Sequence, residues 1–465
     1  MENGLAARHG GRIGLAVLVA ILLLGLGLRL NEAWDGRAPV YDAAAYAAIA
    51  ANLEDGDGFT VGPQATQPSS NYSPGLPLFV AGLYAVTGGQ HERLARVVLA
   101  LIGTLSVLFA YLIGRRLTRL PTDPPLPCEA GRWGVAPALA GAFVVAIYPA
   151  LLEYQAMLMS EPLAATLLSG GVLAALWAWD GGVWRWLLPG ALFGALELTR
   201  PEYLGVALLV AIVIALRSLR SDWRPSLLRA AVFLLAALVV IAPWTIRNAV
   251  ALDRFVPIST GGGQVLFAGT FMPSDGDPEK VGEEVVAENP DLFSPQDAHR
   301  LRLEQILARL AADRYPGMET DQALSKLGKE QLWDDVSEEP AEYAGFVAAK
   351  VWRIWSHGPR DVMREPVWEV VHWLLVAFGL LGLAILAWQR RWEALLIGTI
   401  FLVITAISAL LVASPRRVLV LVPLLAALSS VSAAWLFSRL ESWHRYSEVN
   451  SPVARSERPD SLGAS

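Results

Sequence analysis

Residues 13–30 have the sequence IGLAVLVAILLLGLGLRL, which by itself indicates a membrane helix. The stretch carries one ionisable side chain, Arg29, and about 20 such residues cross the ~30 Å hydrocarbon core of a bilayer as a helix. Nine further apolar segments follow, at residues 94–117, 133–150, 161–179, 184–199, 203–216, 228–246, 368–388, 392–412 and 418–437. We therefore expect an all-α polytopic membrane protein with about ten transmembrane helices.

The composition of the 465 residues agrees with this class. Only 17% are charged, whereas soluble domains carry about 25%, and the mean hydropathy is +0.43. A net charge of -6 argues against a basic nucleic-acid binder, so we expect no nucleic-acid partner and take membrane lipids as the surroundings. One cysteine, Cys128, excludes an internal disulfide framework and a cysteine-rich metal site.

The arginines that flank the spans predict the topology. They all fall on one side if both termini are cytoplasmic and the short apolar segment 76–87 does not cross. These residues are Arg8, Arg12, Arg115, Arg116, Arg119, Arg132, Arg217, Arg220, Arg224, Arg229, Arg390, Arg391, Arg439 and Arg445. We expect a multi-pass protein of the plasma membrane, with segment 76–87 as an interfacial or re-entrant helix.

This topology divides the chain into four parts. Residues 1–247 form an N-terminal transmembrane module of seven spans, which includes a first outer loop at 31–93. Residues 248–367 form a mainly helical extracytoplasmic loop domain, with 21 acidic and 12 basic residues. Residues 368–438 form a C-terminal module of three spans, and residues 439–465 form a cytoplasmic tail.

Ionisable residues are nearly absent from the middles of the spans and gather at their outer ends. Charge within a bilayer usually marks an ion or proton path, so its absence counts against a transporter or pump. The outer layer comprises Arg29, Asp42, Glu153, Glu161, Glu197, Arg200, Glu202, Arg247, Lys350, Arg353, Arg416 and Arg417. Such a layer suits a substrate whose lipid tail stays in the bilayer while its phosphate head meets arginine donors.

Two carboxylates in this layer are candidate catalytic residues, and each has a structural alternative. Asp42 starts an expected interfacial helix at 41–53, where it is either a general base or the helix N-cap. Glu161 lies in Ser160-Glu161-Pro162, which is an ordinary helix start; in a catalytic role it would orient the acceptor or sugar opposite Asp42.

The arginines of the outer layer also have a structural alternative to phosphate binding. Arg416 and Arg417 lie outside against the positive-inside rule, which favours phosphate binding over a topology signal. Arg200 follows Glu197 by three residues, so a local ion pair is the simpler interpretation. The six histidines show no metal-ligand spacing, and the sequence does not decide whether a divalent metal takes part.

Taken in order, these motifs resemble the GT-C membrane glycosyltransferases, in the bacterial branch related to protein O-mannosyltransferases and aminoarabinose transferases. The resemblance covers about residues 12–436. Its carriers are the segments 41–53, 72–77, 160–163, 198–202, 243–248 and 415–417. Two positions depart from the pattern. Ala43 stands where many relatives have a second carboxylate, and Ser73 stands where aminoarabinose transferases have lysine, which disfavours a lipid A-modifying role.

The resemblance implies a polyprenyl-phosphate-sugar donor, an extracytoplasmic site and inversion at the sugar carbon. Asp42 and Glu161 match the family's acidic positions and are the expected catalytic residues. The expected donor-phosphate ligands are Arg416, Arg417, Arg247, Lys350 and Arg200, and the expected first-loop acceptor residues are Tyr41, Tyr46 and Tyr72. No cofactor is required. An O-antigen ligase-like transferase of whole glycans and a lipid-linked sugar flippase are the alternatives; the sugar, acceptor and oligomeric state stay open.

Overall fold

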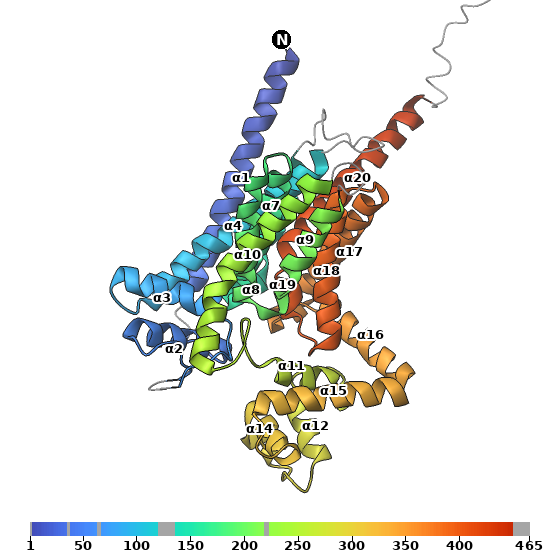
Figure 1. The fold of residues 1–465 in the computed structure, drawn as a ribbon. Coiled ribbons are helices and arrows are strands. Elements are labelled where there is room, and N and C mark those ends of the chain that lie inside the picture. The colour runs from blue at the N-terminus through green and yellow to red at the C-terminus, as the bar shows by residue number, and fades with distance from the viewer. Residues whose placement is uncertain (1, 35–37, 63–66, 120–134, 218–222, 450–465) are drawn as a thin grey trace, which may run out of the picture.

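The computed structural model describes residues 2–34, 38–62, 67–119, 135–217 and 223–449. Every regular element within these ranges is a helix, so the all-α class expected from the sequence is confirmed. The helices form a bundle with a smaller helical body beyond one of its ends (Figure 1).

Seven of the described helices are long and apolar enough to cross a membrane. They are α1 (Glu2–Trp34), α4 (Glu92–Arg119), α7 (Ser160–Trp179), α10 (Trp223–Leu252), α17 (Pro366–Trp388), α18 (Trp392–Leu410) and α20 (Val422–Val449). Helices α5 (Ala136–Ile147) and α6 (Pro149–Ala156) meet at an angle of 41° and are together long and apolar enough for an eighth, broken span. Pro149 explains the break, because proline lacks the N–H that a continuous helix would use.

Two of the ten expected spans form shorter helices. Segment 184–199 becomes a 3₁₀ turn, η2 (Val183–Trp186), followed by α8 (Leu187–Thr199); segment 203–216 becomes η3 (Pro201–Tyr203) and α9 (Val206–Leu216). At 13 and 11 residues, α8 and α9 are shorter than a bilayer crossing requires. Helix α8 packs between α7 and α10, and α9 packs on α10, so both complete the bundle.

The first long loop supplies two short helices at one end of the bundle, α2 (Asp42–Asp55) and α3 (Gly75–Thr87). They pack on each other through Tyr46, Leu76 and Val80. Helix α3 begins against the end of α8, where a Cβ on Gly75 would lie 2.4 Å from the Thr199 hydroxyl oxygen. Only glycine allows this approach, and it fixes the first loop against the bundle.

The smaller body, which we call the loop domain, runs from α11 to α16. Its elements are α11 (Gly262–Thr270), η4 (Met272–Ser274), α12 (Val281–Glu288), α13 (Asp297–Arg300), α14 (Leu303–Arg314), α15 (Thr320–Glu338) and α16 (Pro340–Ser356). It has its own apolar core, which includes Phe267, Val285, Leu307 and Leu324. A further turn, η5 (Asp361–Arg364), leads from it into α17.

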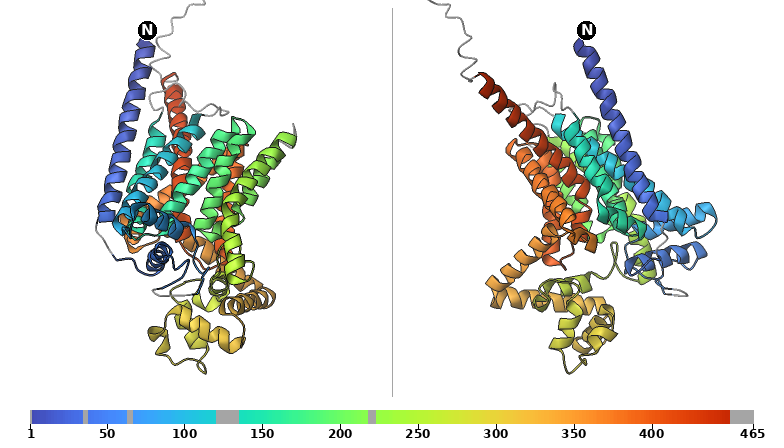
Figure 2. Two further views of the ribbon diagram at one scale, coloured as in Figure 1. Left: turned by 60° about the vertical axis from the view of Figure 1, so that its left-hand side comes forward. Right: turned by 180° about the vertical axis from the view of Figure 1, so that it is seen from behind.

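The loop domain lies at the same end of the bundle as α2 and α3, which we call the loop end (Figures 1 and 2). The beginning of α1 and the end of α20 lie at the opposite end. These two helix ends therefore share one side of the bundle, as the predicted topology requires. Which side faces the cytoplasm stays a prediction from the arginines.

Candidate active site

Arg416 lies between the two carboxylates that the sequence singled out. Its Nε donates to Glu161 Oε1 over 2.6 Å, and its Nη1 donates to Asp42 Oδ2 over 3.0 Å. Arg200 approaches the same Glu161 oxygen with Nη1 at 2.9 Å and donates from Nε to Glu202 Oε1 over 2.6 Å. Acidic and basic groups thus alternate in the order Asp42, Arg416, Glu161, Arg200, Glu202, which we call the charged cluster.

Helix ends at the loop end of the bundle supply these side chains. Asp42 is the first residue of α2, and Glu161 lies in the first turn of α7. Arg200 lies between α8 and η3, and Arg416 begins the short helix α19 (Arg416–Leu419). A carboxylate in a first helical turn is stabilised by the free backbone N–H groups there. Glu161 therefore keeps a favourable position despite its burial.

The cluster is open on one side. The side chains of Asp42 and Arg416 are 39% and 30% exposed, whereas Glu161 is fully buried. A soluble or lipid-borne group can therefore reach Asp42 and Arg416, and Glu161 supports Arg416 from behind. The second carboxylate oxygen of Glu161, Oε2, is buried and has no hydrogen-bond partner within the described ranges.

Two structural alternatives that the sequence allowed are not seen: an N-cap role for Asp42 and a local pair of Arg200 with Glu197. Tyr41 precedes the first turn of α2, and the side chain of Asp42 makes no capping bond there but accepts from Arg416. The expected local pair of Arg200 with Glu197 is wrong as well. Glu197 Oε1 accepts the backbone N–H groups of Gly205 (3.1 Å) and Ala207 (3.0 Å), so it caps the start of α9.

Two of the three predicted tyrosines face the charged cluster. The Tyr46 ring packs edge-to-face on Tyr72, with centroids 5.7 Å apart. Burial and the nearby Asp42 carboxylate raise the pKa of Tyr46, and the same two causes raise the pKa of Tyr72 to about 12. Both phenols therefore keep their protons near neutral pH and can donate hydrogen bonds. Tyr41, by contrast, is 90% exposed.

The other predicted phosphate ligands use their donors on backbone carbonyls. Arg247 donates from Nη1 to Ser69 O over 2.8 Å and from Nη2 to Phe59 O over 3.2 Å, so it ties the first loop to α10. Arg417 donates to the carbonyl of Val412.

Lys350 is buried and donates from Nζ to the carbonyls of Gly269 and Ala409. It thereby joins the loop domain to α18. Burial, with a smaller contribution from the Arg417 charge, lowers the pKa of Lys350 to about 7. The structure thus brings Arg416 and Arg200 to the carboxylates and gives Lys350 a connecting role.

Sequence reasoning did not assign roles to three residues of this region. Glu202 is the second partner of Arg200, Tyr154 lies with its ring centroid 5.6 Å from the Arg416 guanidinium carbon, and Arg360 pairs with Glu153 over 2.7 Å. Glu202 lies in the segment 198–202 and Tyr154 follows Glu153 of the outer charged layer, so these neighbours were the available signal. Arg360, on the segment that leads into α17, offered none.

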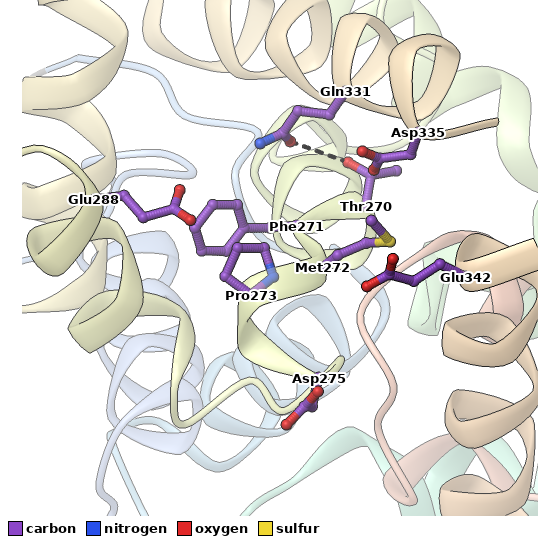
Figure 3. A pocket seen from close by; sticks show the side chains of 9 residues that line it. All are labelled: Thr270, Phe271, Met272, Pro273, Asp275, Glu288, Gln331, Asp335 and Glu342. Atoms are coloured by element: carbon purple, nitrogen blue, oxygen red, sulfur yellow. Dashed lines mark hydrogen bonds between the residues drawn. The ribbon is translucent and has the colours of Figure 1, made fainter. Parts of the chain in front are cut away.

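The loop domain contains a separate cavity of about 500 Å³ (Figure 3). Its lining is apolar at Phe271, Met272 and Pro273, and Thr270 donates to Gln331 across it over 3.3 Å. Four carboxylates complete it: Asp275, Glu288, Asp335 and Glu342. None of the residues of the charged cluster lines this cavity, so it is distinct from the candidate active site.

Known structures share this architecture. The chain aligns with the oligosaccharyltransferase AglB of Archaeoglobus fulgidus, solved with an inhibitory peptide and a dolichol phosphate, at a TM-score of 0.53 and 16% identity over 94% of its length. The two chains share one fold. The apo form of the same enzyme gives a TM-score of 0.54 at 15% identity. This chain spans about half of that enzyme, 52% of its length.

ArnT of Cupriavidus metallidurans, solved with undecaprenyl phosphate, aligns at a TM-score of 0.39 and 15% identity, over 95% of this chain and 80% of that one. No family model and no curated protein matches the sequence. The AglB structures share the fold of this chain, which agrees with the resemblance drawn from the sequence.

Proposed function

We propose that the chain is a membrane glycosyltransferase that moves a sugar from a polyprenyl-phosphate donor to an acceptor on the extracytoplasmic side of the plasma membrane. The observation that carries this proposal is the charged cluster, with a half-exposed carboxylate and a guanidinium side by side at the loop end of a bundle of apolar helices. This position lets a lipid-borne phosphate and a water-borne acceptor meet. The GT-C fold supports the same class of reaction.

Arg416 is the residue best placed for the donor phosphate. Its Nε and Nη1 are bonded to Glu161 and Asp42, while its Nη2 makes no hydrogen bond to a described residue. The two N–H groups of Nη2 can therefore donate to a phosphate oxygen. Charge-assisted hydrogen bonds between a guanidinium and a phosphate are strong. A dolichol phosphate is bound in the AglB complex, which supports a lipid phosphate as the donor. The other four predicted ligands would act on the phosphate only through the electrostatic field of their charges. They are Arg200, Arg417, Arg247 and Lys350.

Asp42 is the proposed general base. An acceptor oxygen attacks the anomeric carbon from the face opposite the phosphate, the bond from that carbon to the phosphate oxygen breaks, and the phosphate leaves with the electron pair. Asp42 takes the acceptor proton, and Arg416 stabilises the charge that grows on the leaving phosphate. A single displacement of this kind inverts the sugar carbon. Glu161 holds Arg416 in place, and Tyr46 and Tyr72 offer hydroxyl donors to the acceptor or sugar.

AglB has also been solved with zinc and sulfate, which raises the question of a metal here. The donor set does not fit one. Asp42 and Glu161 are both bonded to Arg416, and the described residues contain no group of three or more His, Cys, Asp or Glu side chains that could hold a metal ion. The mechanism above therefore has no metal step.

The likeness to AglB also favours a second candidate, the transfer of a whole oligosaccharide rather than one sugar. The two candidates use the same charged cluster and differ in the size of the transferred group. Product mass therefore separates them directly.

The test compares the glycolipids and glycans of cells that have or lack the gene by mass spectrometry. Loss of the gene is expected to accumulate a polyprenyl-phosphate sugar and to remove that sugar from one envelope product. Wild-type chain restores the product and Asp42→Asn does not. Unchanged donor lipids and glycans would overturn the proposal.

A further inference from the structure

The space between Asp42 and Glu161, two of the carboxylates of the charged cluster, is filled by a guanidinium. Arg416 places Nε 2.6 Å from Glu161 Oε1 and Nη1 3.0 Å from Asp42 Oδ2. A divalent cation on Glu161 Oε1 and Asp42 Oδ2 would bind these oxygens at about 2.0–2.6 Å, in the space that the guanidinium fills. The guanidinium and such a cation cannot occupy the site together.

The charges of the surroundings oppose a metal as well. Arg200 lies 2.9 Å from the same Glu161 oxygen, so a cation on that oxygen would lie beside two guanidinium groups. Like charges at this range repel strongly where water is largely excluded. No third acidic, histidine or cysteine ligand joins the pair within the described part of the chain, so nothing offsets the repulsion.

We propose that Arg416 is the built-in cation of the Asp42–Glu161 pair and that sugar transfer needs no divalent metal. A guanidinium stays charged at every physiological pH, and its planar fork fixes how far apart the two carboxylates lie. It thus holds Asp42 in position. The transfer assay below rests on the proposed function. The metal titration does not, because metal binding can be measured without sugar transfer.

The test uses Mn²⁺ as the probe, because carboxylate sites accept it. The full chain is purified in detergent, treated with EDTA and titrated with Mn²⁺ under electron paramagnetic resonance. Wild type is expected to bind no Mn²⁺ that depends on Asp42. Arg416→Gln is expected to gain one Mn²⁺ site, and Arg416→Gln with Asp42→Asn to lose it again.

Arg360→Gln is the matched control, since it removes a guanidinium from a single carboxylate, Glu153. It is expected to gain no Mn²⁺ site. Wild-type binding that Asp42→Asn abolishes would overturn the inference, and so would a folded Arg416→Gln protein that gains no site. If Arg416→Gln fails to fold, the comparison of wild type with Asp42→Asn decides alone: a signal that Asp42→Asn removes overturns the inference, and its absence supports it.

A second measurement follows transfer by the wild type in proteoliposomes, with EDTA and after Mn²⁺ is added back. The rate is expected to stay the same in both conditions. A rate that EDTA abolishes and Mn²⁺ restores would overturn the inference. A chain that transfers no sugar in either condition would instead refute the proposed function, and the Mn²⁺ titration would still decide the role of Arg416.

Discussion

Arg416 and Asp42 are 374 positions apart in the sequence and 3.0 Å apart in the structure, where the guanidinium donates to the carboxylate. The contact joins α19 to α2, so the last loop of the bundle closes on the first. Through Glu161 it also reaches the start of α7. The helix ends that carry the proposed chemistry are thus held together by one side chain.

Asp42→Asn is expected to lower kcat for sugar transfer by roughly 10²–10⁴-fold, the usual range for loss of a general base. Stability should change little, because the pair with Arg416 is partly exposed and such pairs contribute about 0–1 kcal/mol. Kinetics in proteoliposomes check the prediction. Asp55→Asn, at the other end of α2, is the control and should keep wild-type activity. A fully active Asp42→Asn protein would show that Asp42 is not the base.

Glu161→Gln is expected to destabilise the protein, because it removes a buried negative charge that two arginines share. Breaking a buried pair typically lowers the free energy of unfolding by about 3–5 kcal/mol. Glu153→Gln breaks the more exposed pair with Arg360, and about 1 kcal/mol or less is expected there. Thermal unfolding of both purified variants gives the comparison. Equal losses would mean that the burial of Glu161 has no energetic weight.

Lys350 is expected to make stability rise with pH between about pH 7 and pH 10. Its pKa is about 7 in the folded chain, against an ordinary value of 10.5. Within this window the unfolded chain binds a proton at Lys350 that the folded chain does not, so the free energy of unfolding increases as pH increases. Below pH 7 both states hold the proton and the dependence ends.

Lys350→Met removes this titration, so the melting temperature of wild type relative to the variant should increase from pH 7 to pH 9.5. Lys280→Met, at a half-exposed position in the same domain, should show no such trend. A difference between wild type and Lys350→Met that is constant with pH would refute the lowered pKa.

Arg247→Ala is expected to loosen the first loop, because the guanidinium holds the carbonyls of Ser69 and Phe59. Amide hydrogen exchange around these two residues should speed up about tenfold or more, since a bond to a charged group contributes about 1.5–3 kcal/mol. Arg254→Ala, which removes a surface pair with Glu319, should leave this exchange unchanged. Unchanged exchange together with weaker donor binding would return Arg247 to the phosphate site.

Cys128 is expected to be cytoplasmic, because it lies between Arg119 and Arg132. It falls outside the described residues, so the sequence alone carries this prediction. A membrane-impermeant thiol reagent should label it only after lysis. With Cys128→Ser as background, Ser337→Cys on the exposed surface of α15 should be labelled in intact cells. The reverse pattern would invert the topology and place the charged cluster on the cytoplasmic side.

The sequence by itself determined the class of fold and most members of the cluster. Hydrophobicity is a local property, so each long apolar block identifies a membrane helix without knowledge of its neighbours. For the same reason Asp42, Glu161, Arg200 and Arg416 stood out, because charged residues at the ends of apolar helices are exceptions that need partners.

Only the tertiary structure decided which of these charges are partners. The spacing of Glu197 and Arg200 indicated a local pair, yet Arg200 binds Glu161 and Glu202. Arg247 and Lys350 looked like Arg416 in the sequence, but the packing of the first loop and of α18 turned their donors to backbone carbonyls. A side chain pairs with the group that helix packing brings within about 3 Å, and packing depends on the whole chain rather than on any one segment.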